Sequence, residues 1–180
     1  MSKFKNVQVL TAAAMLAAIA VILGFFKIPL SPTLEIRFAV LPIAVSGAMF
    51  GPAVAAVVGI LSDVGGYLLK PTGPFFPGFT VSAAISGVIF GLLLYRKKAT
   101  WLRVTGAMTI RTVVVSILLN SYWLTMLYHK GFVPILAGRI TKELILLPIF
   151  IAMILALLKL LEKTGMFSRF ERKTDESQTS

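Results

Sequence analysis

Several charged, amide and aromatic side chains of this sequence lie within or beside long apolar stretches, where polar groups are costly. Asn120 and Trp123 are three residues apart, and Arg139 and Glu143 are four apart, so each pair would share one face of a helix. Such side chains suit a flat, polar, anionic ligand, because rings stack, amides and carboxylates bind ring nitrogens, and cations bind carboxylates. The candidate binding residues are Glu35, Arg37, Asp63, Phe75, Phe76, Asn120, Tyr122, Trp123, Arg139, Lys142 and Glu143.

Each of these residues also has a plainer interpretation, which the sequence leaves open. Charged residues near helix ends can snorkel to the water interface, and Tyr122 and Trp123 could belong to an interfacial aromatic belt. Asp63 interrupts an apolar run, where a carboxylate must be paired or face water. Because Gly65 and Gly66 permit close helix approach, a structural hydrogen bond to backbone amides is the alternative for Asp63.

Catalytic motifs are missing from the sequence. It has no cysteine and one histidine, which leaves no thiolate or imidazole cluster for a metal. It also has no glycine-rich phosphate loop, no His-Glu-x-x-His and no Gly-x-Ser-x-Gly. We therefore expect no catalytic residues, no metal site and no cofactor.

The elements that position these side chains are predicted to be membrane-spanning helices. Hydrophobic residues make up 57% of the 180 residues and charged residues 14%, which is typical of an integral membrane protein. Helices with ~1.5 Å rise per residue can cross a ~30 Å hydrocarbon core in runs of this length. We predict one all-α membrane domain over 1–180, a bundle of six transmembrane helices with a polar cytoplasmic tail at 162–180. The predicted spans are about 7–26, 36–50, 53–69, 79–95, 104–128 and 134–161.

Two of these spans have particular features. The span at 36–50 is short for a full crossing, so we expect it to be tilted or shielded by its neighbours. The span at 7–26 follows two lysines and could instead be a signal peptide, but no small-x-small cleavage site follows the apolar stretch before Lys27.

The distribution of lysine and arginine predicts the orientation. An even number of spans places both termini on one side, where the termini and the 96–103 loop together hold eleven basic residues against six on the other side. By the positive-inside rule both termini are cytoplasmic. Membrane topology therefore accounts for the net charge of +11, without a nucleic-acid partner. Arg111 lies inside the fifth span, and the sequence indicates no partner for it.

The first span carries a ridge of small residues. Ala14 and Ala18 are four residues apart, so they form a smooth stripe that another helix can approach closely. We interpret this stripe as a docking surface for a partner, with packing inside the bundle as the alternative.

Several segments resemble the substrate-binding S components of energy-coupling factor (ECF) vitamin transporters, and within that family the folate-specific branch. The resemblance covers nearly all of the membrane region. It lies in the alanine-rich first span, in LEIRF at 34–38 and LPI at 41–43, in LSDVGG at 61–66, in FPGFTVSAAISGVIFG at 76–91 and in NSYWL at 120–124.

The resemblance implies a folate-binding, multi-pass subunit of the bacterial cell membrane without an ATPase of its own. It would capture the vitamin outside and dock through Ala14 and Ala18 onto a coupling subunit driven by two ATPase subunits. Either Asp63 or Asn120 would then pair with the pterin edge. Seven other candidates are alternatives for two roles: Trp123, Tyr122, Phe75 or Phe76 for stacking on the ring, and Arg37, Arg139 or Lys142 for holding the glutamate.

Three other functions remain as alternatives. The ligand could be another vitamin, such as riboflavin or pyridoxine, because aromatic stacking serves them all. A stand-alone secondary carrier usually has internal repeats, and none is evident here. A membrane enzyme acting on lipid could use Asp63 and Glu143 as a pair, but no metal or nucleotide motif supports it.

Overall fold

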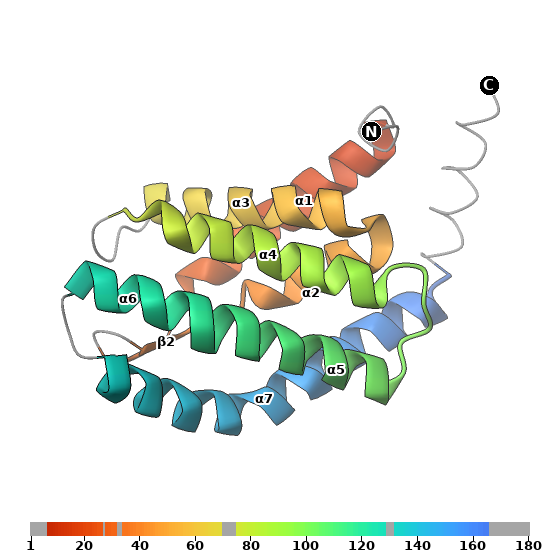
Figure 1. The fold of residues 1–180 in the computed structure, drawn as a ribbon. Coiled ribbons are helices and arrows are strands. Elements are labelled where there is room, and N and C mark those ends of the chain that lie inside the picture. The colour runs from red at the N-terminus through yellow and green to blue at the C-terminus, as the bar shows by residue number, and fades with distance from the viewer. Residues whose placement is uncertain (1–6, 27, 32–33, 70–74, 129–131, 166–180) are drawn as a thin grey trace.

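The computed structural model describes residues 7–26, 28–31, 34–69, 75–128 and 132–165 (Figure 1). Within these ranges the helices are α1 (Val7–Phe25), α2 (Val40–Phe50), α3 (Pro52–Leu69), α4 (Pro77–Leu94), α5 (Trp101–Arg111), α6 (Asn120–Tyr128) and α7 (Phe132–Lys163). A π-helical segment, η2 (Thr112–Leu119), joins α5 to α6. Two short strands, β1 (Ile28–Ser31) and β2 (Leu34–Ile36), follow α1.

Six helical crossings form the bundle, because α5, η2 and α6 run on as one helix. Five of the described helices are long and apolar enough to span a membrane. The sixth, α2, has only 11 residues, but all of them except Met49 are buried. It packs against α1, α3, α4 and α7, which shield it from lipid. The prediction of a six-helix bundle is confirmed, and its short second helix is shielded by its neighbours.

The second span begins later than predicted. Ile36, the expected start, belongs to β2, where it pairs with Ile28 of the antiparallel strand β1. Pro29 lies in β1 opposite Glu35 and disfavours helix at this point. The chain turns at Phe38 and Ala39, and α2 starts at Val40. This hairpin, which was not predicted from the sequence, adds a small β element to the helical fold.

The last two crossings are longer than predicted. The fifth starts at Trp101 instead of residue 104, because hydropathy detects the apolar stretch and not the more polar first turn of the helix. The sixth continues to Lys163, so the predicted polar tail does not begin at Glu162. The Glu162 carboxylate instead accepts a hydrogen bond from the backbone N–H of Ala99, at 2.6 Å. Residues 166–180 of that tail lie outside the described ranges.

The two ends of the bundle differ. The start of α1, the start of α5 and the end of α7 lie at one end (Figure 1). The β1–β2 hairpin, the end of α3, the start of α4 and the end of α6 lie at the other, which we call the hairpin end. Both ends of the described chain are therefore on the same side, as six crossings require.

Glycines allow α3 and α4 to pack closely. A side-chain carbon at Gly59 would collide with the backbone carbonyl of Ala83, and one at Gly87 with that of Ala55. Each helix thus presents a glycine to the other's backbone, which is the usual way in which membrane helices approach closely. This contact fixes α4 against α3 and so positions the side chains at its start.

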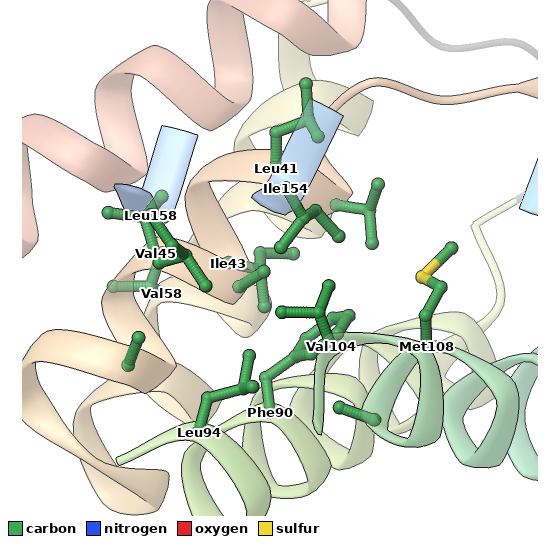
Figure 2. Packing of buried hydrophobic residues seen from close by; sticks show 14 of the residues in the cluster. Leu41, Ile43, Val45, Val58, Phe90, Leu94, Val104, Met108, Ile154 and Leu158 are labelled. Atoms are coloured by element: carbon green, nitrogen blue, oxygen red, sulfur yellow. The ribbon is translucent and has the colours of Figure 1, made fainter. Parts of the chain in front are cut away.

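The apolar core lies away from the hairpin end along three of the longer helices. Figure 2 shows Phe90 of α4, Val104 and Met108 of α5, and Ile154 and Leu158 of α7 gathered around α2. All five side chains are fully buried. The half of the bundle nearer the hairpin end contains the polar candidates instead.

Candidate ligand-binding site

Asp63 forms the first group of polar side chains at the hairpin end. Its Oδ2 accepts a hydrogen bond from the Thr80 hydroxyl at 2.8 Å, and its Oδ1 is 3.5 Å from Nη1 of Arg37. The Asp63 side chain is 14% exposed and the Arg37 side chain 51%. Arg37 follows β2 directly, so this ion pair links the hairpin to α3. Among the described residues, Asp63 is bound by the side chains of Thr80 and Arg37. The alternative interpretation of Asp63 was a hydrogen bond to backbone amides.

Trp123 is the centre of an aromatic group. Its ring centroid lies 5.5 Å from that of Phe76, at a tilted angle, and 5.2 Å from that of Tyr122, in an edge-to-face contact. The indole N–H donates to the Ser82 hydroxyl at 3.1 Å. Gly78 is buried beneath the indole, which leaves no space for a side chain at that position. These contacts hold the indole in one orientation, as stacking on a flat ligand requires.

Phe75 is not part of this aromatic group in the structure. Its ring packs on Tyr67 with centroids 5.0 Å apart, and the side chain is 46% exposed. Of the two adjacent phenylalanines, Phe76 therefore contacts Trp123, whereas Phe75 extends the aromatic surface toward α3.

Helix α4 positions both the acidic and the aromatic group. Thr80 contacts Asp63 of α3, and Ser82 contacts Trp123 of α6. Residues two apart in a helix point about 200° away from each other, so the two groups occupy opposite flanks of α4. Neither Thr80 nor Ser82 was among the predicted site residues. The feature of the sequence that could have identified them is a hydroxyl side chain within an apolar span.

A third group of polar residues is basic and lies where η2 meets α7. Arg139 is buried and donates from Nη1 to the backbone carbonyl of Ser116 at 2.8 Å. Arg111 donates from its own Nη1 to the Ser116 hydroxyl at 2.9 Å. Lys142 Nζ lies 3.4 Å from Glu143 Oε1, and both side chains are largely buried. These contacts place all four charged residues in the interior, whereas snorkelling would place them at the water interface.

Asn120 lies in the first turn of α6, directly after η2. Its buried Oδ1 has no hydrogen-bond partner within the described part of the chain. Buried polar atoms are nearly always bonded to protein or ordered water. This oxygen is therefore a candidate acceptor for a ligand.

Two further predicted features concern the hairpin and the first helix. Glu35 lies in β2 opposite Pro29, and its side chain is not among those described. Ala14 and Ala18 are both exposed on α1. Met15 and Ile19 next to them are exposed too, at 63% and 44%. The alanine stripe is thus open on the outside of the bundle and not occupied by a helix of the described part of this chain.

The family of the chain follows from comparison with known proteins. Residues 8–159 match the model of a family described as ECF transporter, substrate-specific component. This chain belongs to that family. As an ECF substrate-specific component it is a multi-pass protein of the bacterial cell membrane and a transporter subunit, not an enzyme.

Curated relatives agree with this assignment. The chain is 35% identical to the folate transporter FolT of Clostridium novyi (strain NT), over 92% of the chain and 96% of that protein. It is 32% identical to the FolT of Leuconostoc mesenteroides, over 76% of each. The riboflavin transporter RibU of Staphylococcus aureus (strain TCH60) is 29% identical over 68% of each.

A solved structure is also similar. The crystal structure of FolT bound with folic acid superposes with a TM-score of 0.80 at 31% identity, covering 86% of this chain and 94% of that one. The fold of this ECF substrate-specific component is therefore that of FolT.

Proposed function

We propose that this ECF substrate-specific component binds folate at its hairpin end. The observation that carries the proposal is the oriented indole of Trp123, which packs at a tilt against Phe76 and donates a hydrogen bond to Ser82. Two relatives named as folate transporters, and the likeness to FolT with bound folic acid, support the choice of vitamin.

The contacts favour particular roles for the candidate residues. A pterin is flat and has adjacent donors and acceptors on one edge, so it suits stacking on Trp123 and Phe76 with hydrogen bonds to Asn120, which lies on the same helix as Trp123. Thr80 and Arg37 hold the Asp63 carboxylate in place. Tyr122 is 57% exposed and borders the indole from outside, which suits closing over a ligand more than lining its deepest part.

Transport would require partners. We infer that the exposed Ala14–Ala18 stripe docks onto a membrane coupling subunit, with two separate ATPases supplying the energy. The stripe is apolar and flat, as close helix packing in a membrane requires. The positive-inside rule places the hairpin end outside, where the vitamin is captured.

Riboflavin is the second candidate ligand. The similarity to RibU favours it specifically, and an isoalloxazine ring would stack on the same indole. Pyridoxine would fit the same chemistry.

Tryptophan fluorescence tests the proposed function, because the chain has only two tryptophans and they lie at opposite ends of the bundle. Titration of the purified protein with folic acid should quench its emission with saturable, tight binding. Riboflavin and pyridoxine should leave the emission unchanged at the same concentrations. Mass spectrometry of any ligand retained during purification gives an independent identification.

Matched tryptophan variants locate the binding. With Trp123→Phe most of the ligand-dependent quenching should be lost, whereas Trp101→Phe, at the exposed start of α5, should keep it. Full quenching in Trp123→Phe would exclude the aromatic group as the site. Saturable binding of riboflavin, without binding of folic acid, would show that riboflavin and not folate is the ligand.

A further inference from the structure

Two arginines converge on one serine in the membrane interior. Ser116 of η2 is 3% exposed, and it accepts hydrogen bonds through its hydroxyl from Arg111 and through its backbone carbonyl from Arg139. Arg111 comes from the end of α5 and Arg139 from α7. A π-helical segment departs from regular α-helical hydrogen bonding, and such segments are often found at functional sites.

The charges around this serine are mostly positive. Lys142 and Glu143 form an ion pair on α7, and Glu143 is also within electrostatic range of Arg111. Arg111, Arg139, Lys142 and Glu143 therefore form a cluster of three cations and one carboxylate. Cations in a membrane interior are expensive and usually mark a functional pathway or site.

Groups that can donate hydrogen bonds lack partners at the two ends of η2. Arg111 Nε, Thr112 Oγ1 and Ser121 Oγ are all buried, and none has a hydrogen-bond partner among the described residues. They flank the two ends of η2 on one continuous helix. Since buried polar atoms are almost always satisfied, this grouping indicates a polar molecule that binds here.

We propose that Arg111 and Arg139, steadied by Ser116 and assisted by Lys142, form an anion-binding site for the carboxylates of the transported ligand. This inference rests on the proposed function, since the glutamate half of folate carries two carboxylates. Two guanidiniums offer planar pairs of donors that match carboxylate geometry. Arg111, which the sequence left without a role, becomes a residue that selects for anionic ligands.

Removing charge from either the protein or the ligand tests this site. We would titrate the full-length purified parent and Arg111→Gln with folic acid and with folic acid dimethyl ester, which has no carboxylates. The parent should bind folic acid more tightly than the ester. Arg111→Gln should bind folic acid roughly tenfold to a hundredfold more weakly, because a charge-assisted hydrogen bond is lost, and should bind the ester within about threefold of the parent.

Two further variants serve as controls. Arg111→Lys keeps the charge and should recover part of the preference for folic acid over the ester. Arg103→Gln removes an exposed arginine from the same helix and should change neither affinity. Equal weakening for both ligands in Arg111→Gln and Arg111→Lys would identify a purely structural arginine and overturn the anion site. An unchanged preference in Arg111→Gln would overturn it as well.

A ligand fragment separates this proposal from the proposed function. p-Aminobenzoyl-L-glutamate has both carboxylates but no pterin, and at ~10 mM it should raise the unfolding temperature of the parent but not of Arg111→Gln. If the parent fails to bind folic acid yet is stabilised by the fragment, the folate assignment fails and the anion site stands. No stabilisation of the parent by the fragment would overturn the anion site, whatever folic acid does.

Discussion

At the scale of single residues, the space beneath the Trp123 indole is the sharpest structural constraint. A side-chain carbon at Gly78 would lie 2.6 Å from Cδ2 of Trp123 and against the Phe76 ring. Gly78→Ala should therefore push the two rings apart and weaken folate binding at least about tenfold, or ~1.4 kcal/mol. Fluorescence titration measures this change in affinity.

A second glycine provides the matched control. Gly106 lies in the middle of α5, and a side-chain carbon there would meet nothing within 4 Å. Gly106→Ala should leave the affinity unchanged and stabilise the helix slightly, by about 0.5–1 kcal/mol. Equal affinities for the two variants would show that the orientation of the indole does not determine binding.

The residues that the sequence identified are those whose type is conspicuous in a membrane helix. Asp63 and Arg139 stood out because charge is rare there, and Trp123 because it shares a helix face with Asn120. Thr80, Ser82 and Ser116 were missed, since a hydroxyl is common in apolar helices and acquires meaning only from its partner. The hydrogen bond of Arg111 to Ser116, five residues on, follows the π-helical backbone of η2. The electrostatic attraction between Arg111 and Glu143 depends on how η2 faces α7, which spacing along one chain does not determine.

At the scale of elements, hydropathy located the helices and missed features that depend on backbone geometry. All six crossings follow from apolar runs, because the bilayer demands them. The hairpin of β1 and β2 is too short for a clear alternation of apolar and polar residues, so its last residue, Ile36, was assigned to the next helix. The π-helical segment η2 is more apolar than α5 and α6 on either side of it, and its composition is also that of a regular membrane helix, so composition does not reveal the π-helical geometry.

The exposed stripe on α1 leads to a prediction about docking. Leucine at both Ala14 and Ala18 would roughen the flat surface and keep a partner helix at a distance. We expect the double variant to bind folate normally, to lose most ATP-driven uptake and to co-purify poorly with the coupling subunit. Uptake into cells and co-purification measure these effects.

Helix α7 supplies the control for this experiment. Ala152 and Ala156 are also exposed and four residues apart, so leucine at both positions adds the same bulk to a different helix. This variant should transport normally. A loss of uptake in the α7 variant alone would show that α7, and not α1, carries the docking surface. Normal uptake in both variants would show that neither alanine stripe is needed for docking.

At the scale of the whole molecule, the bundle separates binding from packing. Inside the bundle, apolar side chains fill the half away from the hairpin end, whereas the buried charged residues and the Trp123 aromatic group occupy the half near it. Rigid packing of the apolar half fixes the positions of the helices, and the same helices carry the polar groups of the half near the hairpin end. The number of crossings follows from the sequence, but the grouping of the polar residues into three clusters required the fold.

The orientation of the bundle can be tested because the chain has no cysteine of its own. Phe75 at the hairpin end and Lys98 in the loop between α4 and α5 are both exposed, so each can be replaced singly by cysteine. The basic residues at the Lys98 end should keep that end in the cytoplasm. A membrane-impermeant maleimide should then label Phe75→Cys in intact cells, and Lys98→Cys only after the membrane is permeabilised. The reverse pattern would place the proposed binding site on the cytoplasmic side and contradict capture of the vitamin from outside.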